Sequence, residues 1–572
     1  MKAPYSFIVA FLFSMASYAQ PVSLAKLIAV PVFLPASSVF PVPGSSINYT
    51  QILFEYPADS KAVTYVVRIY EMNGKDSVLF REVKDSSNAV IVDGFSFGKS
   101  YNWSYRSLNR KGKVLAKSRI YSFNILPLPG TVRINVVKND SAQNQQGLIS
   151  FDNAQIIVDR SGNPVWFLPP APNKEFVRDD LVRDLRITPA GTTTFLTEKN
   201  CYELSFDGRI LWKGPKVDST SPNYIENYHH AFERLPNGNF MVAGNHTVKV
   251  NTGDTIVQGR FGVVGEYDRR GKLLWKWDSY TYFSEKDLLY KKGPNGKPDI
   301  STHLNAFEYA DGGRTIYAGF RDMNRVVKVD WASGKVLASY GSPMPSGDAA
   351  TGKDFFNKQH DITLLRNGNL AVFNNDSIGV PGVISSVVIF SQVTQPGEQS
   401  QIVWEFPCKW DSLTDGKSEK GGSIDELPNG NYLINMGSLH RCIEITPDKR
   451  IVWDVVEEYY NTDSAKYLPF RQYRSHYVSS LYPCWFTAII RTNNSKAVTV
   501  EVVNEGTEAD NYSVQYRLTD GAWVEAATYE NVAPGVKKQC MIPRQPGIPV
   551  NEVRVISLAN RDFVRTFNVK LK

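Results

Sequence analysis

The sequence lacks the features that mark helical, membrane-spanning and zinc-binding proteins. It has no long stretch of helical hydrophobic periodicity, and no run of the roughly 18 to 20 apolar residues that a membrane helix needs. Its five cysteines lie far apart, without CxxC or Cys/His zinc spacing, at positions 201, 408, 442, 484 and 540. We therefore expect no membrane span and no metal site, and at most two disulfides with one free thiol.

Basic charge is not concentrated anywhere along the chain. The 64 Lys and Arg residues only slightly outnumber the 57 Asp and Glu residues, and they are dispersed. A nucleic-acid partner needs a clustered basic surface, so we expect no nucleic acid to bind.

The chain begins MKAPYSFIVAFLFSMASYAQ, in which Lys2 precedes a short apolar run and small residues lead up to Ala19. This pattern predicts a cleavable secretory signal peptide over residues 1–19. The mature protein is then expected to be exported, in the periplasm or an equivalent compartment.

Short runs rich in Val, Ile, Tyr and Phe alternate with clusters of Gly, Pro, Asn, Asp and Ser, and aromatic residues make up 12% of the chain. This composition is typical of all-β proteins. Residues 20–128 read as an N-terminal β-sandwich of the Ig/Fn3-like kind, and residues 486–572 as a small C-terminal β module.

A short motif recurs six times over residues 129–485, between these two parts. It consists of a turn followed by two apolar residues, the second of which is usually tryptophan. That place is taken by Trp166, Trp212, Trp275, Leu337, Trp404 and Trp453, at intervals of 46 to 67 residues. Such a period fits four-stranded blades, so six occurrences predict a six-bladed β-propeller.

A second phrase, of the type LPNGN, interleaves with the first and predicts one tight type I′ hairpin in most blades. His230 and His360 lie seven residues before the Asn of their turns, and His303 lies eight before the Asp of its turn. Antiparallel pairing puts His440 and Arg321, which follow their turns, at the same end of the blades. Equivalent ends of the innermost strands converge on one mouth of a propeller channel. Each of these histidines alone is more often structural, but their repeated placement favours a functional cluster there.

The chemistry of such a cluster allows two interpretations. Three neutral imidazoles can bind zinc or copper, but these come from different blades, and a neighbouring arginine repels a cation. Histidine with arginine favours an anion, because both offer charged donors to a phosphoryl or sulfuryl group while one neutral imidazole can attack it. His229, beside His230, is equally consistent with channel packing, and His246 and His476 have no positional support.

Three segments resemble the bacterial arylsulfate sulfotransferases. They are THLNAFEYADGGRTIYAGFRDMNRVVKVDWASGKVLASYG (302 to 341), QHDITLLRNGNLAVFNND (359 to 376) and GSIDELPNGNYLINMGSLH (422 to 440). The resemblance covers roughly residues 130 to 485. It implies an exported six-bladed propeller with an N-terminal sandwich, and it is compatible with a homodimer.

The resemblance also implies a reaction. A histidine takes the sulfuryl group from a phenolic sulfate ester as a covalent sulfohistidine and passes it to a phenol acceptor, with no nucleotide sulfate donor and no cofactor. By motif the nucleophile is His440, and His303 and His360 hold the sulfuryl oxygens and carry the proton. The residues expected to contact the substrate are Asn305, Arg321, Arg441, His230 and Asn375.

This chain departs from the family pattern in one place. The family has an arginine after the Q-H element, whereas this chain continues Phe373, Asn374, Asn375 without one. Arg321 or Arg441 could replace its charge, or the enzyme could use another donor or be less active. The alternative function is a non-catalytic propeller that binds an anionic or sulfated ligand.

Overall fold

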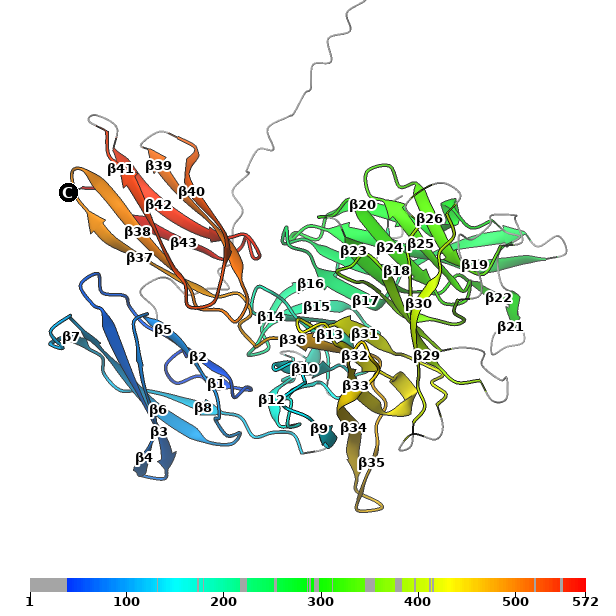
Figure 1. Ribbon diagram of the computed structural model, residues 1–572, viewed down its shortest axis with the longest axis horizontal. Coiled ribbons are helices and arrows are strands. Elements are labelled where there is room, and N and C mark those ends of the chain that lie inside the picture. The colour runs from blue at the N-terminus through cyan, green and yellow to red at the C-terminus, as the bar shows by residue number, and fades with distance from the viewer. Residues whose placement is uncertain are drawn as a thin grey trace, which may run out of the picture. The chain divides into compact units, whose positions relative to one another are not determined.

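The computed structural model describes residues 39–571 apart from short gaps (Figure 1). The gaps are 131, 172–173, 178–179, 217–223, 252–254, 285–286, 288–289, 293–297, 311, 345–354, 376–382, 394, 396–397, 411–412, 414–415, 519–520 and 546–548, and side chains are also not described for 290–292 and 298–299. The signal peptide predicted at residues 1–19 lies outside the described residues.

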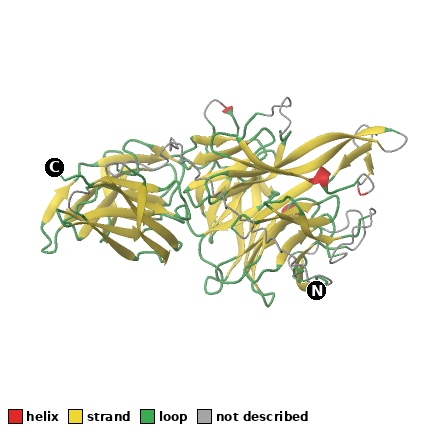
Figure 2. Ribbon diagram, turned by 90° about the horizontal axis from the view of Figure 1, so that it is seen from above, coloured by secondary structure: helices red, strands yellow, loops and turns green. Residues whose placement is uncertain are grey.

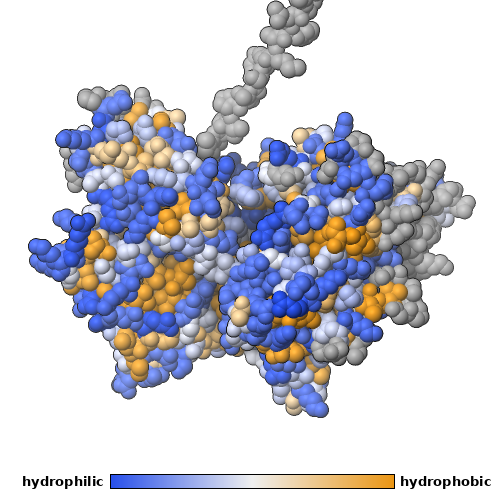
Figure 3. Space-filling view, in the orientation of Figure 1, coloured by the Kyte–Doolittle hydropathy of each residue, from blue (hydrophilic) through white to orange (hydrophobic). Residues whose placement is uncertain are grey.

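The described chain is almost entirely β-structure, which confirms the predicted all-β class (Figure 2). Its helical segments are short 3-10 turns, such as η2 (Ser279–Thr281) and η4 (Gly437–Leu439). No helix among the described residues is long and apolar enough to cross a membrane. On the face shown in Figure 3, apolar areas are interrupted by polar ones.

Two sheets form the N-terminal part, and two more form the C-terminal part. The N-terminal strands are β1 (Ser46–Ile47), β2 (Ile52–Glu55), β3 (Thr64–Asn73), β4 (Asp76–Asp85), β5 (Ala89–Val92), β6 (Ser100–Leu108), β7 (Val114–Lys117) and β8 (Tyr121–Ile125). The C-terminal strands are β37 (Phe486–Asn493), β38 (Ala497–Asn504), β39 (Asp510–Leu518), β40 (Trp523–Val532), β41 (Lys537–Pro543), β42 (Val550–Ser557) and β43 (Val564–Asn568). The two parts are joined directly, because Arg565 donates hydrogen bonds of 2.6 and 2.8 Å to Glu55.

Six further sheets are formed by the described residues between these parts, and their pairs are antiparallel except for the parallel pair β19 and β22. The first three comprise β10 (Leu148–Phe151), β11 (Ile156–Asp159), β12 (Pro164–Phe167) with β36 (Ser475–Val478); β13 (Arg183–Ile187), β14 (Thr192–Leu196), β15 (Cys201–Ser205), β16 (Ile210–Lys213); and β17 (Tyr228–Arg234), β18 (Phe240–Asn251), β19 (Ile256–Tyr267), β20 (Leu273–Asp278), β21 (Tyr290–Lys292), β22 (Pro298–Ser301). The others comprise β23 (Leu304–Ala310), β24 (Thr315–Phe320), β25 (Arg325–Asp330), β26 (Val336–Gly341); β27 (His360–Leu364), β28 (Leu370–Asn374), β29 (Ser386–Phe390), β30 (Ile402–Pro407); and β31 (Ser423–Glu426), β32 (Tyr432–Asn435), β33 (Arg441–Ile445), β34 (Ile451–Asn461), β35 (Lys466–Pro469) with β9 (Val132–Asn139).

Strands from the two ends of this region pair with each other. β36 is antiparallel to β10, with Val478 opposite Leu148, and β34 is antiparallel to β9, with Tyr459 opposite Val132. The strands β13, β17, β23, β27, β31 and β36 each contact the next, and β36 contacts β13. Six strands from six sheets therefore meet in a closed series, and their first residues lie around one centre.

The repeated tryptophans link neighbouring sheets. They occupy the strands β12, β16, β20, β30 and β34. Each indole N–H donates to a backbone carbonyl of the following sheet: Trp166 to Phe206 (3.0 Å), Trp212 to Asp268 (3.3 Å), Trp275 to Trp331 (2.9 Å), Trp404 to Pro447 (2.9 Å) and Trp453 to Arg160 (2.7 Å). The last of these bonds connects the sixth sheet to the first. The repeat therefore marks a sheet-to-sheet hydrogen bond, which Leu337 cannot make.

The predicted hairpins are present, but the turn after β17 is not of type I′. In the turn Leu235–Gly238, the Gly238 N–H donates to the Leu235 carbonyl at 2.9 Å, and Gly238 has φ of +86° while Asn237 is not in the left-handed region. This geometry is a type I turn followed by a left-handed glycine. Pro236 explains the difference, because its ring fixes φ near −65° and a type I′ turn needs positive φ there.

The sequence allowed at most two disulfides and one free thiol, and the structure forms no disulfide among these cysteines. All five cysteines are free and buried. Cys201, Cys408 and Cys442 belong to three different hydrophobic cores, so their strands hold them apart as small apolar side chains.

Candidate functional site

Aromatic rings from four sheets meet where the central strands begin. His229 and His230 lie in β17, His303 precedes β23, His360 begins β27, and Tyr473 precedes β36. The His230 ring stacks on His303 with centroids 5.1 Å apart and on Tyr473 at 5.5 Å, and it contacts His229 at 4.9 Å. Tyr473 in turn meets the His360 ring edge-to-face at 5.6 Å. The structure thus brings His230, His303 and His360 together around a tyrosine.

The backbone is bent where these rings project. His230 and His303 have φ of +66° and +53°, and the register with the second strand shifts after Tyr228 and after Leu304. A β-bulge of this kind re-aims a side chain out of the regular alternation. A non-glycine residue in this region costs about 1–3 kcal/mol, which is commonly found where a site requires the geometry.

The tautomer of His360 is fixed by Asn375. The Asn375 side chain is 1% exposed, and its amide group donates to the carbonyls of Ser418 at 3.1 Å and Gly421 at 2.9 Å. Its Oδ1 is therefore the atom that lies 2.7 Å from His360 Nδ1, and it can only accept. His360 consequently carries its proton on Nδ1, and the lone pair on Nε2 is left for chemistry.

His303 faces a shared carboxylate. Its Nδ1 lies 3.3 Å from Asp322, whose other oxygen lies 2.9 Å from Arg321 and 3.4 Å from Lys358. The Arg321 N–H also donates to the His303 carbonyl at 2.9 Å, which holds the two residues at the same strand end. The Asp322 carboxylate can orient the His303 ring, so His303 is suited to exchanging a proton with a bound molecule.

Tyr473 was not singled out from the sequence, although it lies at the centre of the cluster. Its side chain is 8% exposed, and its hydroxyl has no hydrogen-bond partner among the described residues. The guanidinium groups of Arg183 and Arg474 each lie 5.5 Å from its ring centroid. Burial raises the pKa of Tyr473 to about 12, so the hydroxyl stays protonated and is a free donor. The only sequence signal was its place at the start of the last β-run before the C-terminal module.

Burial sets the charge state of the imidazoles. It lowers the pKa of His229 to about 4 and that of His360 to about 3, and nearby cationic groups add to the effect at His360. The pKa of His230 is held well below its usual range, by burial and by His229 and His303. These three rings are therefore neutral at pH 7, and the nearby guanidinium groups are cationic.

The other predicted residues lie in different surroundings. Asn305 is buried and donates to the Gln359 carbonyl at 2.7 Å, beside the cluster. Arg441 pairs with Asp454 in the outer strand β34, so its charge is neutralised away from the cluster.

His440 ends the short helix η4 in a left-handed conformation, with φ of +58°. Its loop touches the residues before β31, since the Ser438 N–H donates to the Lys420 carbonyl at 3.1 Å. Burial lowers the pKa of His440, and a hydrogen bond to the Phe470 backbone opposes that shift. No ring contact between His440 and the cluster is found among the described residues.

A buried ionic network lies beside the cluster, and no sequence pattern predicts it. Arg474 lies 3.1 Å from Asp184, and His476 lies 3.0 Å from Asp184 and 3.2 Å from Asp425. Burial alone would lower the pKa of His476, but the two carboxylates raise it to about 9. His476 is therefore a charged structural residue, and it holds β36 to its neighbours.

These features define a site for an oxyanion. It offers a free buried hydroxyl, two or more guanidinium groups and neutral imidazoles, one of which has a fixed and available lone pair. Among the described residues, no group of three His, Cys, Asp or Glu side chains is arranged to hold a metal ion.

The chain is thus an all-β protein in which imidazole, phenol and guanidinium groups meet where its central strands begin. Residues 133–467 match the family described as arylsulfotransferase (ASST), and this match spans more than half of the chain. The chain belongs to the arylsulfotransferase family, which supports sulfotransferase activity toward phenolic compounds. No curated protein matches the chain in sequence.

Solved structures give only weak likenesses. A Bacteroides caccae protein of unknown function is 15% identical, with 57% of this chain and 93% of that chain covered and a TM-score of 0.31. The Kuenenia stuttgartiensis hydrazine synthase is 12% identical, with 52% and 99% covered and a TM-score of 0.29. Kluyveromyces lactis Hsv2 is 11% identical, with 58% and 99% covered and a TM-score of 0.23. These values are too low to bear on function.

Proposed function

We propose that this chain is an aryl-sulfate sulfotransferase that moves a sulfuryl group from a phenolic sulfate ester to a phenol through a covalent sulfohistidine, without a nucleotide donor. The observation that carries the proposal is the fixed tautomer of His360, whose Nε2 lone pair lies in a cluster of anion-binding groups. Family membership supplies the substrate class.

The first half-reaction is an attack of His360 Nε2 on sulfur. The N–S bond forms as the bond from sulfur to the phenolic oxygen breaks, and protonated His303 gives its proton to the leaving oxygen. The Tyr473 hydroxyl and the Arg183 and Arg321 guanidinium groups are placed to hold the sulfuryl oxygens, where charge is greatest.

The second half-reaction reverses the first with a new phenol. Neutral His303 takes the proton of the acceptor hydroxyl as its oxygen attacks sulfur, and the N–S bond breaks. His360 is returned neutral and His303 protonated, so protons and charge balance over the cycle. One histidine serving both halves requires ping-pong kinetics.

His360 is a better candidate for the nucleophile than His440, which the GSLH motif favoured. His360 lies among the rings and cations of the cluster, whereas the described hydrogen bonds of His440 are to the backbones of Gly437, Glu457 and Phe470. His303 keeps the role given to it from the sequence, and Arg321 takes the place of the arginine that is missing after the Q-H element.

The proposal includes an architecture. The closed series of six sheets and the Trp453 bond to Arg160 support a six-bladed propeller over residues 129–485. The sheets formed by β1–β8 support an N-terminal sandwich, and export through a leader at residues 1–19 completes the proposal.

The test uses p-nitrophenyl sulfate as donor and phenol as acceptor. Transfer predicts acceptor-dependent nitrophenol release, and donor alone should leave a protein adduct of one sulfuryl group by intact mass, which peptide mapping should place on His360. Release that does not depend on acceptor would indicate hydrolysis. No release and no adduct would favour the alternative, a propeller that only binds an anionic or sulfated ligand.

A further inference from the structure

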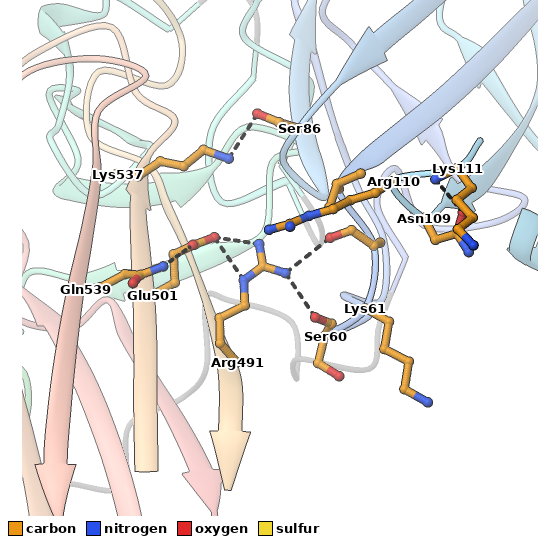
Figure 4. A pocket seen from close by; sticks show the side chains of 12 residues that line it. Ser60, Lys61, Ser86, Asn109, Arg110, Lys111, Arg491, Glu501, Lys537 and Gln539 are labelled. Atoms are coloured by element: carbon orange, nitrogen blue, oxygen red, sulfur yellow. Dashed lines mark hydrogen bonds and ion pairs between the residues drawn. The ribbon is translucent and has the colours of Figure 1, made fainter. Parts of the chain in front are cut away.

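A second anion-binding pocket lies between the N-terminal and C-terminal parts (Figure 4). Its volume is about 580 Å³, and none of its lining residues belongs to the six central sheets. On one side are three N-terminal loops, which contribute Ser60 to Val63, Ser86, and Asn109 to Lys111. On the other side is the sheet of β37, β38 and β41. The pocket is therefore separate from the histidine cluster.

The pocket is held open by fixed contacts. Arg491 donates to Glu501 at 2.5 and 3.2 Å, and across the interface to the carbonyls of Ser60 at 3.3 Å and Ala62 at 3.2 Å. Lys537 donates to the Ser86 hydroxyl at 2.9 Å. The two walls are thus bonded directly to each other, so binding needs little rearrangement.

The charge of the lining is strongly positive. Its one carboxylate, Glu501, is already paired with Arg491. Lys61, Arg110 and Lys111 are exposed and form no ion pair with any described residue. Figure 4 shows the Arg110 side chain reaching toward the Arg491 guanidinium. Cations gathered in a concave surface attract anions more strongly than cations scattered over a convex one.

The uncharged residues that line the pocket indicate which class of anion it can bind. No aromatic residue lines the pocket, so it offers no platform on which nucleic-acid bases could stack. Its apolar lining is limited to Ala62 and Val63, which is too little for a lipid chain or an apolar peptide. Serine hydroxyls and the Asn109 and Gln539 amides are suited to hydrogen bonding with sugar hydroxyls.

We propose that this pocket binds an acidic carbohydrate segment, whose sulfate or carboxylate groups pair with Arg110, Lys111 and Lys537. Several separated cations require several acidic groups, so an oligosaccharide should bind far better than a single inorganic anion. This proposal does not depend on the proposed sulfuryl transfer, so a failure of one does not affect the other.

The test compares fluorescently labelled sugars by anisotropy. The probes are a heparin hexasaccharide, which carries sulfate and carboxylate, a hexagalacturonate, which carries carboxylate alone, and neutral maltohexaose. Arg110→Gln/Lys111→Gln should weaken binding of an acidic sugar by about 10-fold or more, since two charges inside a concave site are lost. Lys113→Gln/Lys117→Gln is the matched control, because it removes two exposed charges from the same β6–β7 hairpin outside the pocket, and it should change binding by less than about 3-fold.

Comparison of the two acidic probes identifies which acidic group is recognised. Equal losses in both variants would mean non-specific charge attraction and would overturn the proposal, as would failure of both acidic sugars to bind. If neutral maltohexaose bound with the same affinity as the acidic sugars, charge would not contribute to recognition and the proposal would be wrong. A dT oligonucleotide could bind more tightly than the acidic sugars and lose the same fraction of its affinity in Arg110→Gln/Lys111→Gln. The ligand would then be a nucleic acid, and the carbohydrate proposal would be wrong. Turnover of p-nitrophenyl sulfate should be the same in both variants and wild type.

Discussion

Replacement of Asn375 by leucine tests the tautomer argument most directly. Leucine has nearly the same size but neither accepts from His360 Nδ1 nor donates to the Ser418 and Gly421 carbonyls. The His360 ring is 3% exposed, so its Nδ1–H would have no water to replace the lost acceptor.

The expected loss follows from that burial. An unpaired buried donor costs about 1–3 kcal/mol, which the ring can avoid by moving its proton to Nε2 or by turning. Either response removes the attacking lone pair, so kcat should fall roughly 5- to 150-fold, the same free energy expressed as a rate. KM for the donor should change little, because the side-chain oxygen and nitrogen of Asn375 are already bonded to His360 and to two backbone carbonyls.

The assay is acceptor-dependent release of nitrophenol, with rates divided by the folded fraction from urea denaturation. Asn374→Leu is the control, because Asn374 is the preceding residue, is also buried, and bonds to the Asn357 N–H and the Ser386 hydroxyl rather than to His360. It should lose stability but keep its kcat per folded molecule. Wild-type kcat in Asn375→Leu, or equal losses in both variants, would refute the assignment of His360 Nε2.

Three further predictions follow from the same contacts. His360→Ala should abolish the sulfuryl adduct seen by intact mass, whereas His440→Ala should retain it; the reverse result would restore His440 as the nucleophile. Tyr473→Phe should lower kcat by about 10²- to 10³-fold, the value of one donor to developing charge, with an unchanged urea midpoint because its hydroxyl has no described partner, and an unchanged kcat would remove it from the site. The folded-state pKa of His476, about 9, lies above the ordinary value of 6.5, so its stabilisation is complete below pH 6.5 and is lost as pH rises through 9. Urea denaturation should show up to about 3 kcal/mol of that loss in wild type and none of it in His476→Gln, and identical pH profiles would show that the ion pairs to Asp184 contribute nothing.

The all-β class and the repeated sheet pattern could be predicted from the sequence, because both are local. A strand alternates with period two, and a hairpin turn needs glycine at fixed places, so each leaves a signal within about ten residues. The tryptophan repeat was visible for the same reason, since each Trp occupies an equivalent place in its own sheet. The predicted turn type was wrong at 235–238, because Pro236 fixes a negative φ where type I′ needs a positive one.

The composition of the site was decided only by the tertiary structure. His230, His303 and His360 could be grouped because each precedes a recognisable turn, but Tyr473 precedes a strand whose partner, β10, lies more than three hundred residues earlier. No local pattern reports such a pairing, and none reports that Asn375 directs its oxygen at His360. The motif predicts that His440 lies at the same end of its sheet as the other histidines. The loop between β32 and β33 instead brings it into contact with the Phe470 backbone. Sequence spacing determines where along a strand a side chain lies, whereas bulges and ring closure decide which side chains meet.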